Sequence, residues 1–298
     1  MIKAAVVQAG SVPFDRARTL EKLESLAADA ARAGARLAVF PEAFVGGYPK
    51  GIDFGAVVGR RTPEGREQFR RYFEGAIAVP GPDVERIGKA ARSCGLHLVV
   101  GAIERDGGTL YCTALFFADD GRFLGKHRKL MPTAAERLVW GFGDGSTLPV
   151  FETPVGRVGA VICWENYMPM LRMAMYSKGV QLWCAPTADD RETWLPTMRH
   201  VALEGRCFVL SACQVLKRSD LPASTLSDEF LMRGGSCIVD PLGKVLAGPL
   251  FEKETILAAD LDLDEIARGK YDFDVTGHYA RPDVFRLTVD DKPLKPVS

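Results

Sequence analysis

The chain has 298 residues, 47% of them hydrophobic and 26% charged, a length and composition that suit a globular protein with a sizeable core. Its 38 Lys and Arg residues are balanced by 38 Asp and Glu residues, so it lacks the basic excess expected of proteins that bind nucleic acid or an anionic membrane. No apolar run is long enough to cross a bilayer, and the first residues do not have the pattern of a signal peptide.

Strands and helices alternate along the first half of the chain. Residues 14–33 carry leucines and alanines at helical spacing, and Gly34 follows as a typical helix end. The order strand, helix, strand predicts parallel strands joined by a right-handed crossover. In chain order we expect a strand at 1–8, a helix at 14–33, a strand at 37–40, a helix at 83–94, a strand at 96–103 and a hairpin of 110–117 with 122–126.

The segment from about residue 46 to 82 differs from its surroundings because it combines glycines, prolines and five arginines. It is too small to bury a hydrophobic core of its own, so we interpret it as an insertion over the edge of the sheet. Its arginines are expected to form a solvated face rather than a binding patch.

The alternation continues in the second half, where short turns add hairpins. The whole pattern predicts an α/β protein with a mixed sheet, or two packed sheets, and helices outside. No repeat or linker interrupts it, so residues 1–298 are expected to form a single domain. The expected elements are a hairpin of 149–152 with 157–163, a helix at 168–178, a strand at 180–185, a helix at 193–205, a strand at 207–215, a hairpin of 236–240 with 244–246, a strand at 255–261 and a short helix at 263–268.

The seven cysteines form no Cys-x-x-Cys pair, so they predict neither a disulfide framework nor a zinc site. The four histidines have no metal-ligand spacing among them. We therefore expect reduced thiols, a cytoplasmic protein and no metal.

One cysteine has an unusual setting. The apolar, β-branched run from Val158 to Ile162 predicts a buried strand that ends at Cys163, and the bulky polar residues Trp164 and Glu165 come next. A cysteine in this position is by itself more often a small core residue than a nucleophile. Cys184 and Cys237, which also lie in predicted strands, are expected to be core residues.

Two other predicted strands end in reactive groups, Glu42 and Lys129. Ligands of α/β proteins bind where strands end, so these groups could meet Cys163 there. A lysine ammonium lowers the pKa of a thiol, and a carboxylate can accept its proton, so the three groups would form a consistent nucleophilic site. Each has an ordinary alternative, because a strand-end glutamate often caps or faces solvent and Lys129 lies in a basic run that could be solvated. His127 could be mistaken for the base of a Cys-His pair, but strand alternation directs it to the face opposite its neighbours.

Short motifs surround these residues along the whole chain. In order, they are Phe40-Pro41-Glu42-Ala43-Phe44 with Gly47-Tyr48-Pro49, His127-Arg128-Lys129-Leu130 with Pro132-Thr133, Glu136-Arg137 with Trp140-Gly141, Gly143-Asp144-Gly145-Ser146, Cys163-Trp164-Glu165-Asn166, Cys184-Ala185-Pro186-Thr187, Glu204-Gly205-Arg206-Cys207-Phe208-Val209 and Gly277-His278-Tyr279-Ala280-Arg281-Pro282-Asp283.

In these motifs the chain resembles the nitrilase branch of the carbon–nitrogen hydrolase superfamily. The resemblance implies a four-layer α-β-β-α sandwich with Cys163 as nucleophile, Glu42 as general base and Lys129 as the cation that stabilises the tetrahedral intermediate. It further implies that Glu136 helps to position the catalytic groups or water and that the backbone N–H of Trp164 is a second donor to the oxyanion. Tyr48 and Trp164 are expected to line the substrate pocket.

The resemblance also implies an activity, hydrolysis of an organic nitrile to the carboxylic acid and ammonia through a thioimidate and an acyl-enzyme, without a cofactor. A cyanide-hydrolysing enzyme, an amide-forming relative and an amidase remain alternatives, as does an inactive oligomeric scaffold. We expect a homo-oligomer, at least a dimer, with residues from about 270 to 298 as an interface segment.

Overall fold

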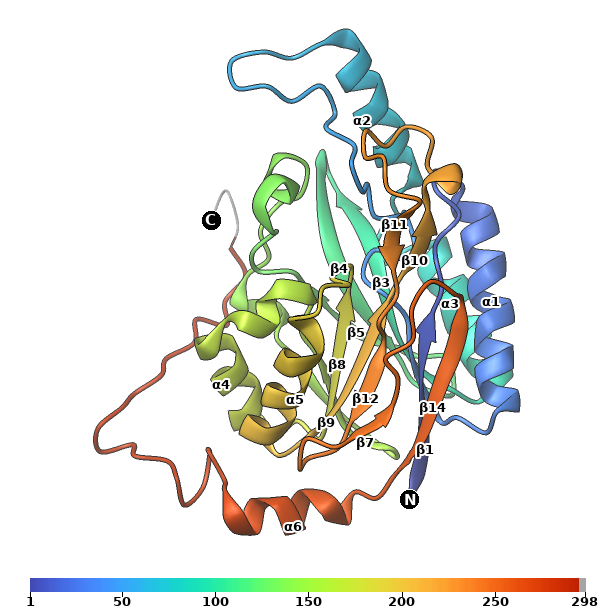
Figure 1. Cartoon of the computed structure of the whole chain (residues 1–298). Coiled ribbons are helices and arrows are strands. Elements are labelled where there is room, and N and C mark those ends of the chain that lie inside the picture. The colour runs from blue at the N-terminus through green and yellow to red at the C-terminus, as the bar shows by residue number, and fades with distance from the viewer. Residues whose placement is uncertain (295–298) are drawn as a thin grey trace.

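Alternation of side chains along the strands explains the layers of the structure. In β1 (Ile2–Gln8), Ala4 and Val6 point to one side of the sheet and Ala5 and Val7 to the other, and all four are buried. A strand that is buried on both faces must be covered on both faces. In this computed structural model, which describes residues 1–294, a second sheet covers one face and helices cover the other (Figure 1).

Within the described residues there are two six-stranded sheets. The first has the order β14-β1-β2-β3-β4-β5 and the second the order β13-β12-β9-β8-β7-β6. Their strands are β1, β2 (Leu37–Val39), β3 (His97–Asp106), β4 (Thr109–Phe117), β5 (Phe123–Arg128), β6 (Val150–Thr153), β7 (Gly156–Ala160), β8 (Leu182–Thr187), β9 (Phe208–Cys213), β12 (Cys237–Val239), β13 (Val245–Ala247) and β14 (Thr255–Leu261).

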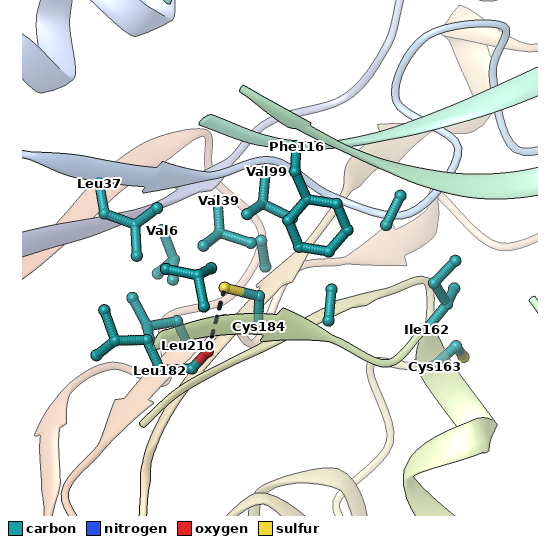
Figure 2. Packing of buried hydrophobic residues seen from close by; sticks show 14 of the residues in the cluster. Val6, Leu37, Val39, Val99, Phe116, Ile162, Cys163, Leu182, Cys184 and Leu210 are labelled. Atoms are coloured by element: carbon teal, nitrogen blue, oxygen red, sulfur yellow. Dashed lines mark hydrogen bonds between the residues drawn. The ribbon is translucent and has the colours of Figure 1, made fainter. Parts of the chain in front are cut away.

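The main core lies between the two sheets. Val39, Val99 and Phe116 of the first sheet face Leu182 and Leu210 of the second, and all five side chains are at most 1% exposed (Figure 2). Both sheets contribute β-branched and aromatic side chains to one contiguous cluster. Each sheet therefore needs the other to exclude water from its inner face. Cys184 lies in the same cluster, as predicted, and the predicted core residue Cys237 is buried under the neighbouring helices.

Helices complete the outer layers. Leu20 and Leu23 of α1 (Arg16–Arg32) and Ile87 of α3 (Pro82–Cys94) pack on the outer face of the first sheet. Met175 of α4 (Pro169–Ser177) and Met198 of α5 (Trp194–Gly205) pack on the outer face of the second. The predicted four-layer α-β-β-α sandwich is therefore confirmed, and α1 and α3 lie on the opposite side of it from α4 and α5 (Figure 1).

Strand direction brings the functional ends together. β2 runs parallel to β1 and β3, while β5 is two antiparallel steps from β3, so β2 and β5 end at the same edge of their sheet. In the second sheet, β7 runs parallel to β8 and β8 to β9. Glu42, Lys129 and Cys163 each follow the carboxyl end of one of these strands.

The second half of the chain differs from the sequence-based expectation in three details. The predicted strand at 207–215 is two strands, β9 and β10 (Val215–Lys217), and β10 pairs with β11 (Phe230–Arg233) in a separate two-stranded sheet. The chain divides at Gln214 because the side chain of this residue bonds to Ser11 and to the carbonyl of Glu42. β11 was not predicted because its apolar stretch is only four residues long, and it pairs with a single strand, the three-residue β10. The strand that precedes Cys163 ends at Ala160, and Cys163 begins a 3₁₀ turn.

The segment at 46–82 contains α2 (Pro63–Gly75), which starts at the Thr62 cap and buries Tyr72. The five arginines of this segment are exposed, as predicted.

After α6 (Asp264–Asp272) the chain is extended and returns to the 3₁₀ turn at Gly145–Thr147, where the Leu294 N–H donates to Asp144 Oδ2 over 2.8 Å. The last part of the predicted interface segment, residues 295–298, lies outside the described residues. No helix in the described part of the chain is long and apolar enough to span a membrane.

Candidate active site

A buried ammonium between two carboxylates forms the centre of the site. Lys129 Nζ donates to Glu42 Oε1 over 2.6 Å and to Glu136 Oε2 over 2.7 Å. The side chains of Lys129 and Glu42 are fully buried and that of Glu136 is 8% exposed. Charges are buried in proteins only when they are paired, so each of these groups depends on the others.

Glu42 follows β2 on a tightly packed turn. Its neighbour Ala43 has a left-handed backbone conformation, with φ of 51°. The turn lies against Gly101 of β3, where an added Cβ would come within 2.0 Å of the Pro41 carbonyl oxygen. Only a glycine at this point of β3 allows the Glu42 turn to pack so closely, so the sheet itself sets the position of the carboxylate.

Lys129 is the first residue after β5. Its backbone N–H donates to the Cys112 carbonyl of β4 over 2.8 Å, which continues the β4–β5 pairing by one residue. Its ammonium lies 5.6 Å from the centre of the Trp140 ring. Burial by itself would lower the pKa of Lys129, but the charges of Glu42, of Cys163 once it is ionised, and of Glu136 outweigh burial and raise it well above its usual value. The lysine is therefore a fixed cation at neutral pH.

Glu136 lies in a 3₁₀ turn at Ala134–Leu138. Its Oε2 also accepts the Thr133 N–H over 2.6 Å, and its Oε1 accepts the Tyr48 hydroxyl over 2.6 Å. One hydrogen-bonded series thus runs from Tyr48 through Glu136 and Lys129 to Glu42.

Cys163 sits at the first position of the 3₁₀ turn at Cys163–Tyr167, with φ of 51°. Such a conformation costs an ordinary residue on the order of 1–3 kcal/mol and is found mainly at functional sites. The Asn166 side chain stabilises the turn by donating to the carbonyls of Cys163, over 2.7 Å, and Val161, over 3.1 Å. The cysteine itself is only 4% exposed.

The pKa of Cys163 is raised overall, although Lys129 lowers it. Burial raises the pKa of this thiol, Glu42 and Glu136 raise it further, and Lys129 and a hydrogen bond with Thr187 only partly oppose them. Lys129 lowers the pKa as expected, but burial and the two carboxylates outweigh this one cation. At neutral pH the sulfur is a thiol and needs a base.

Glu42 has the properties of such a base. Burial raises the pKa of Glu42 above the usual 4.5, Glu136 raises it further, and Lys129 lowers it without cancelling these effects. Its Oε1 is occupied by Lys129 and by the Cys112 thiol at 3.5 Å, whereas its Oε2 is buried without a hydrogen-bond partner among the described residues. A buried unpaired carboxylate oxygen costs free energy and is available to take a proton.

One carboxylate connects the two halves of the site. Glu165 accepts the Ile162 N–H over 2.8 Å and the Leu130 N–H over 2.6 Å, so it bonds to the residue before Cys163 and to the residue after Lys129. Its third partner is His127 Nε2, at 2.9 Å. Burial would lower the pKa of His127, but Glu165 outweighs burial and raises it, so the buried imidazole is paired with Glu165 rather than with Cys163.

Trp164 lies at the rim, with 40% of its surface exposed. Its Nε1 donates to Asp189 Oδ2 over 2.8 Å, and the Arg191 guanidinium lies over its ring at 4.6 Å. Of the six predicted site residues, the structure joins Tyr48, Glu136, Lys129 and Glu42 by hydrogen bonds. Cys163 lies near enough that, once ionised, it raises the pKa of Lys129.

Three further residues contact Glu42 or Cys163 and were not predicted as site residues. Cys112 lies beside Glu42, Thr187 Oγ1 lies 3.2 Å from Cys163 Sγ, and Gln214 Nε2 donates to the Glu42 carbonyl over 2.8 Å. Thr187 and Gln214 lie at the carboxyl ends of β8 and β9, next to the strand that leads to Cys163. Their positions at strand ends could therefore have identified both residues from the sequence. Identifying Cys112 would have required knowing which residues of β4 and β5 lie opposite one another.

Comparison with known proteins assigns the chain to a family. A family model for carbon–nitrogen hydrolases matches residues 3–271. A nitrilase from Bradyrhizobium diazoefficiens is 65% identical, over 99% of this chain and 94% of that protein. An aliphatic nitrilase from Sinorhizobium fredii is 63% identical, over 99% of this chain and 97% of that protein. A bifunctional nitrilase/nitrile hydratase from Lupinus angustifolius is 56% identical, over 100% and 88%.

A solved structure has the same fold. An amidase from Nesterenkonia sp. superposes with a TM-score of 0.67 at 24% identity, over 89% of this chain and 92% of that one. At this identity the similarity supports the sandwich alone. The match to the family model and the high identity to full-length relatives show that the chain belongs to the carbon–nitrogen hydrolase family, in its nitrilase branch.

Proposed function

We propose that this protein is a nitrilase that hydrolyses an organic nitrile to the carboxylic acid and ammonia, with Cys163, Glu42, Lys129 and Glu136 as its catalytic residues. The observation that carries the proposal is the buried Glu42–Lys129–Glu136 array beside a strained, buried cysteine. Identities of 65% and 63% to proteins named as nitrilases support the same substrate class.

The first step joins the sulfur to the nitrile carbon. The raised pKa of Cys163 means that the thiol proton must leave as the bond forms, and the unpaired Oε2 of Glu42 is the group suited to accept it. The carbon–nitrogen triple bond becomes the double bond of a thioimidate, and the proton passes from Glu42 to the nitrogen. Lys129 holds its charge before the reaction begins, so it stabilises negative charge on nitrogen and later on oxygen without reorganisation.

Two water molecules complete the reaction. The first, deprotonated by Glu42, adds to the thioimidate and gives a tetrahedral species that carries O, N and S on one carbon. Loss of ammonia leaves a thioester on Cys163, and the second water releases the acid and restores the thiol. The Trp164 N–H is proposed as a further donor to the oxyanion, and Tyr48 and Trp164 as walls of the substrate pocket.

The tetrahedral species can also expel the sulfur instead of ammonia, which releases an amide. Similarity to a Lupinus angustifolius protein named as a bifunctional nitrilase/nitrile hydratase supports the amide as a second product of this chain. An amidase is less well supported, because the likeness to a solved amidase, at 24% identity, concerns the fold.

We also propose a cytoplasmic homo-oligomer of two or more copies. All seven cysteines are free thiols, which suits a reducing compartment. The extended chain after α6 exposes large apolar side chains, including Tyr279 at 58%, Phe285 at 76% and Leu294 at 78%. Large exposed apolar groups of this kind favour burial against another copy. Light scattering of the purified protein should give a mass of at least twice 32.5 kDa, and a monomer at micromolar concentration would refute the oligomer.

Removing the sulfur should abolish turnover. Cys163→Ala is expected to release no measurable ammonia from a panel of aliphatic and aromatic nitriles, because no other group can form the thioimidate. Cys184→Ala is the matched control, since it removes an equally buried thiol from the core between the sheets. This control should lose stability and keep its turnover number. Ammonia release by Cys163→Ala at the wild-type rate would contradict the assignment.

The pH dependence should report Glu42. Because the pKa of Glu42 is raised, its carboxylate becomes protonated while the pH is still above 4.5, and kcat/KM should fall on the acid side through that higher value. The titratable groups whose interactions with Glu42 affect a pKa are Lys129, Glu136, Cys112, Cys163, Tyr48 and Tyr72. Glu136→Gln removes a carboxylate that raises the pKa of Glu42, so the acid limb should move to lower pH. An acid limb that does not move would count against Glu42 as the base.

Glu165 should act by positioning Cys163 and Lys129. Glu165→Gln keeps the size of the side chain but cannot accept from all three of its donors, so the two backbone segments should shift apart. We expect kcat to fall on the order of 10²-fold with little change in KM, because a small misplacement of catalytic groups slows the chemical step by about this factor. Glu204→Gln, which breaks the Arg172–Glu204 pair between α4 and α5, is the control for a purely structural loss. Equal effects on kcat in both variants would show that Glu165 has no special role.

A further inference from the structure

A hydroxyl group contacts the sulfur of Cys163. Thr187 lies at the carboxyl end of β8, its side chain is fully buried, and its Oγ1 is 3.2 Å from Cys163 Sγ. The same oxygen accepts the backbone N–H of Asp189 over 2.9 Å. Thr187 is therefore placed between a fixed backbone donor and the reacting atom.

The donor and acceptor roles follow from these two contacts. A backbone N–H can only donate, so Asp189 uses a lone pair of the Thr187 oxygen and leaves the hydroxyl hydrogen free. While Cys163 is a thiol, either partner can donate in the contact between oxygen and sulfur. Once the sulfur has lost its proton, only the arrangement in which the hydroxyl donates to the thiolate remains. The contact is thus stronger in the charged state than in the resting state.

The orientation of the hydroxyl is held by a second set of contacts. The Asp189 carboxylate accepts from Trp164 Nε1 over 2.8 Å and from the Arg191 backbone N–H over 3.0 Å, and its side chain is 3% exposed. These bonds fix the loop after β8, and with it the N–H that points at Thr187. A preorganised donor of this kind needs no rearrangement when charge develops.

We propose that Thr187 is a further catalytic residue, whose hydroxyl donates a hydrogen bond to the Cys163 sulfur as it becomes a thiolate, and that Asp189 is the positioning residue that directs this hydroxyl. Thr187 keeps its own proton throughout, and the thiol proton goes to Glu42. This role deepens the proposed nitrilase function and rests on it. A hydrogen bond to a charged group is roughly twice as strong as one to a neutral group, so its loss should reduce thiolate formation about tenfold.

The experiment compares Thr187→Val, which has nearly the same shape and no hydroxyl, with Thr187→Ser, which keeps the hydroxyl. The rate of alkylation of Cys163 by iodoacetamide at neutral pH, resolved by mass spectrometry of the peptide, reports thiolate formation without any nitrile. Cys94, the most exposed of the seven cysteines, provides an internal reference thiol in the same samples. Ser211→Ala removes a buried hydroxyl from the adjacent strand β9 and controls for the loss of such a group in general.

Thr187→Val should slow alkylation of Cys163 about tenfold and leave Cys94 unchanged, and it should lower kcat on nitriles by at least as much. Thr187→Ser and Ser211→Ala should stay within about twofold of the wild type. A folded Thr187→Val protein with wild-type alkylation of Cys163 would overturn the proposal. If Thr187→Val does not fold, the smaller Thr187→Ala gives the same comparison and the same two outcomes.

The two proposals fail in different ways. A wild-type protein that releases no ammonia from any nitrile would refute the proposed function, whereas the alkylation rates would still report on Thr187. Normal turnover with equal alkylation in wild type and Thr187→Val would refute only the role of Thr187.

Discussion

The site depends on shielding one charged group, the ammonium of Lys129, from water. Lys129 is enclosed by two carboxylates and the ring of Trp140 at the edge of a sandwich whose core excludes water. Removing such charges from water costs several kcal/mol per ion unless each is paired and hydrogen-bonded. The fold meets this condition by holding one partner after β2 and the other in a turn after β5. The same low-dielectric setting makes the charge effective, since the field of Lys129 on a bound nitrile is not screened by solvent.

Local strain accompanies this arrangement. Ala43 beside Glu42, Ala134 close to Glu136, and Cys163 itself all have positive φ angles without being glycines. Each costs of order 1–3 kcal/mol, and each is maintained by neighbouring contacts, such as the Asn166 bonds to the Cys163 turn. The strain points side chains into the site at angles that a regular strand or helix would not allow. The stability of the sandwich core thus maintains the geometry of its edge.

The two sheets must also be kept in register with each other at this edge, because Lys129 comes from one and Cys163 from the other. The packing between the sheets is apolar and does not by itself fix positions to a fraction of an ångström. Glu165 supplies a directional link, since it bonds to backbone on both sides and is itself paired with the buried His127. The buried pair with His127 also holds the Glu165 carboxylate in the orientation that these two bonds require.

Sequence by itself determined the succession of strands and helices, because alternating and 3.6-residue patterns record which faces are buried. It also placed Glu42, Lys129 and Cys163 at strand ends, and the family motifs indicated their roles. Only the tertiary structure decided that Gln214 divides one predicted strand into two, since this depends on a partner about 170 positions away in the chain. It also decided the direction of the Cys163 pKa, because burial and two distant carboxylates, which no local pattern encodes, outweigh the lysine. The contact between Thr187 and the sulfur arose in the same way, from the parallel register of neighbouring strands rather than from any signal within either strand.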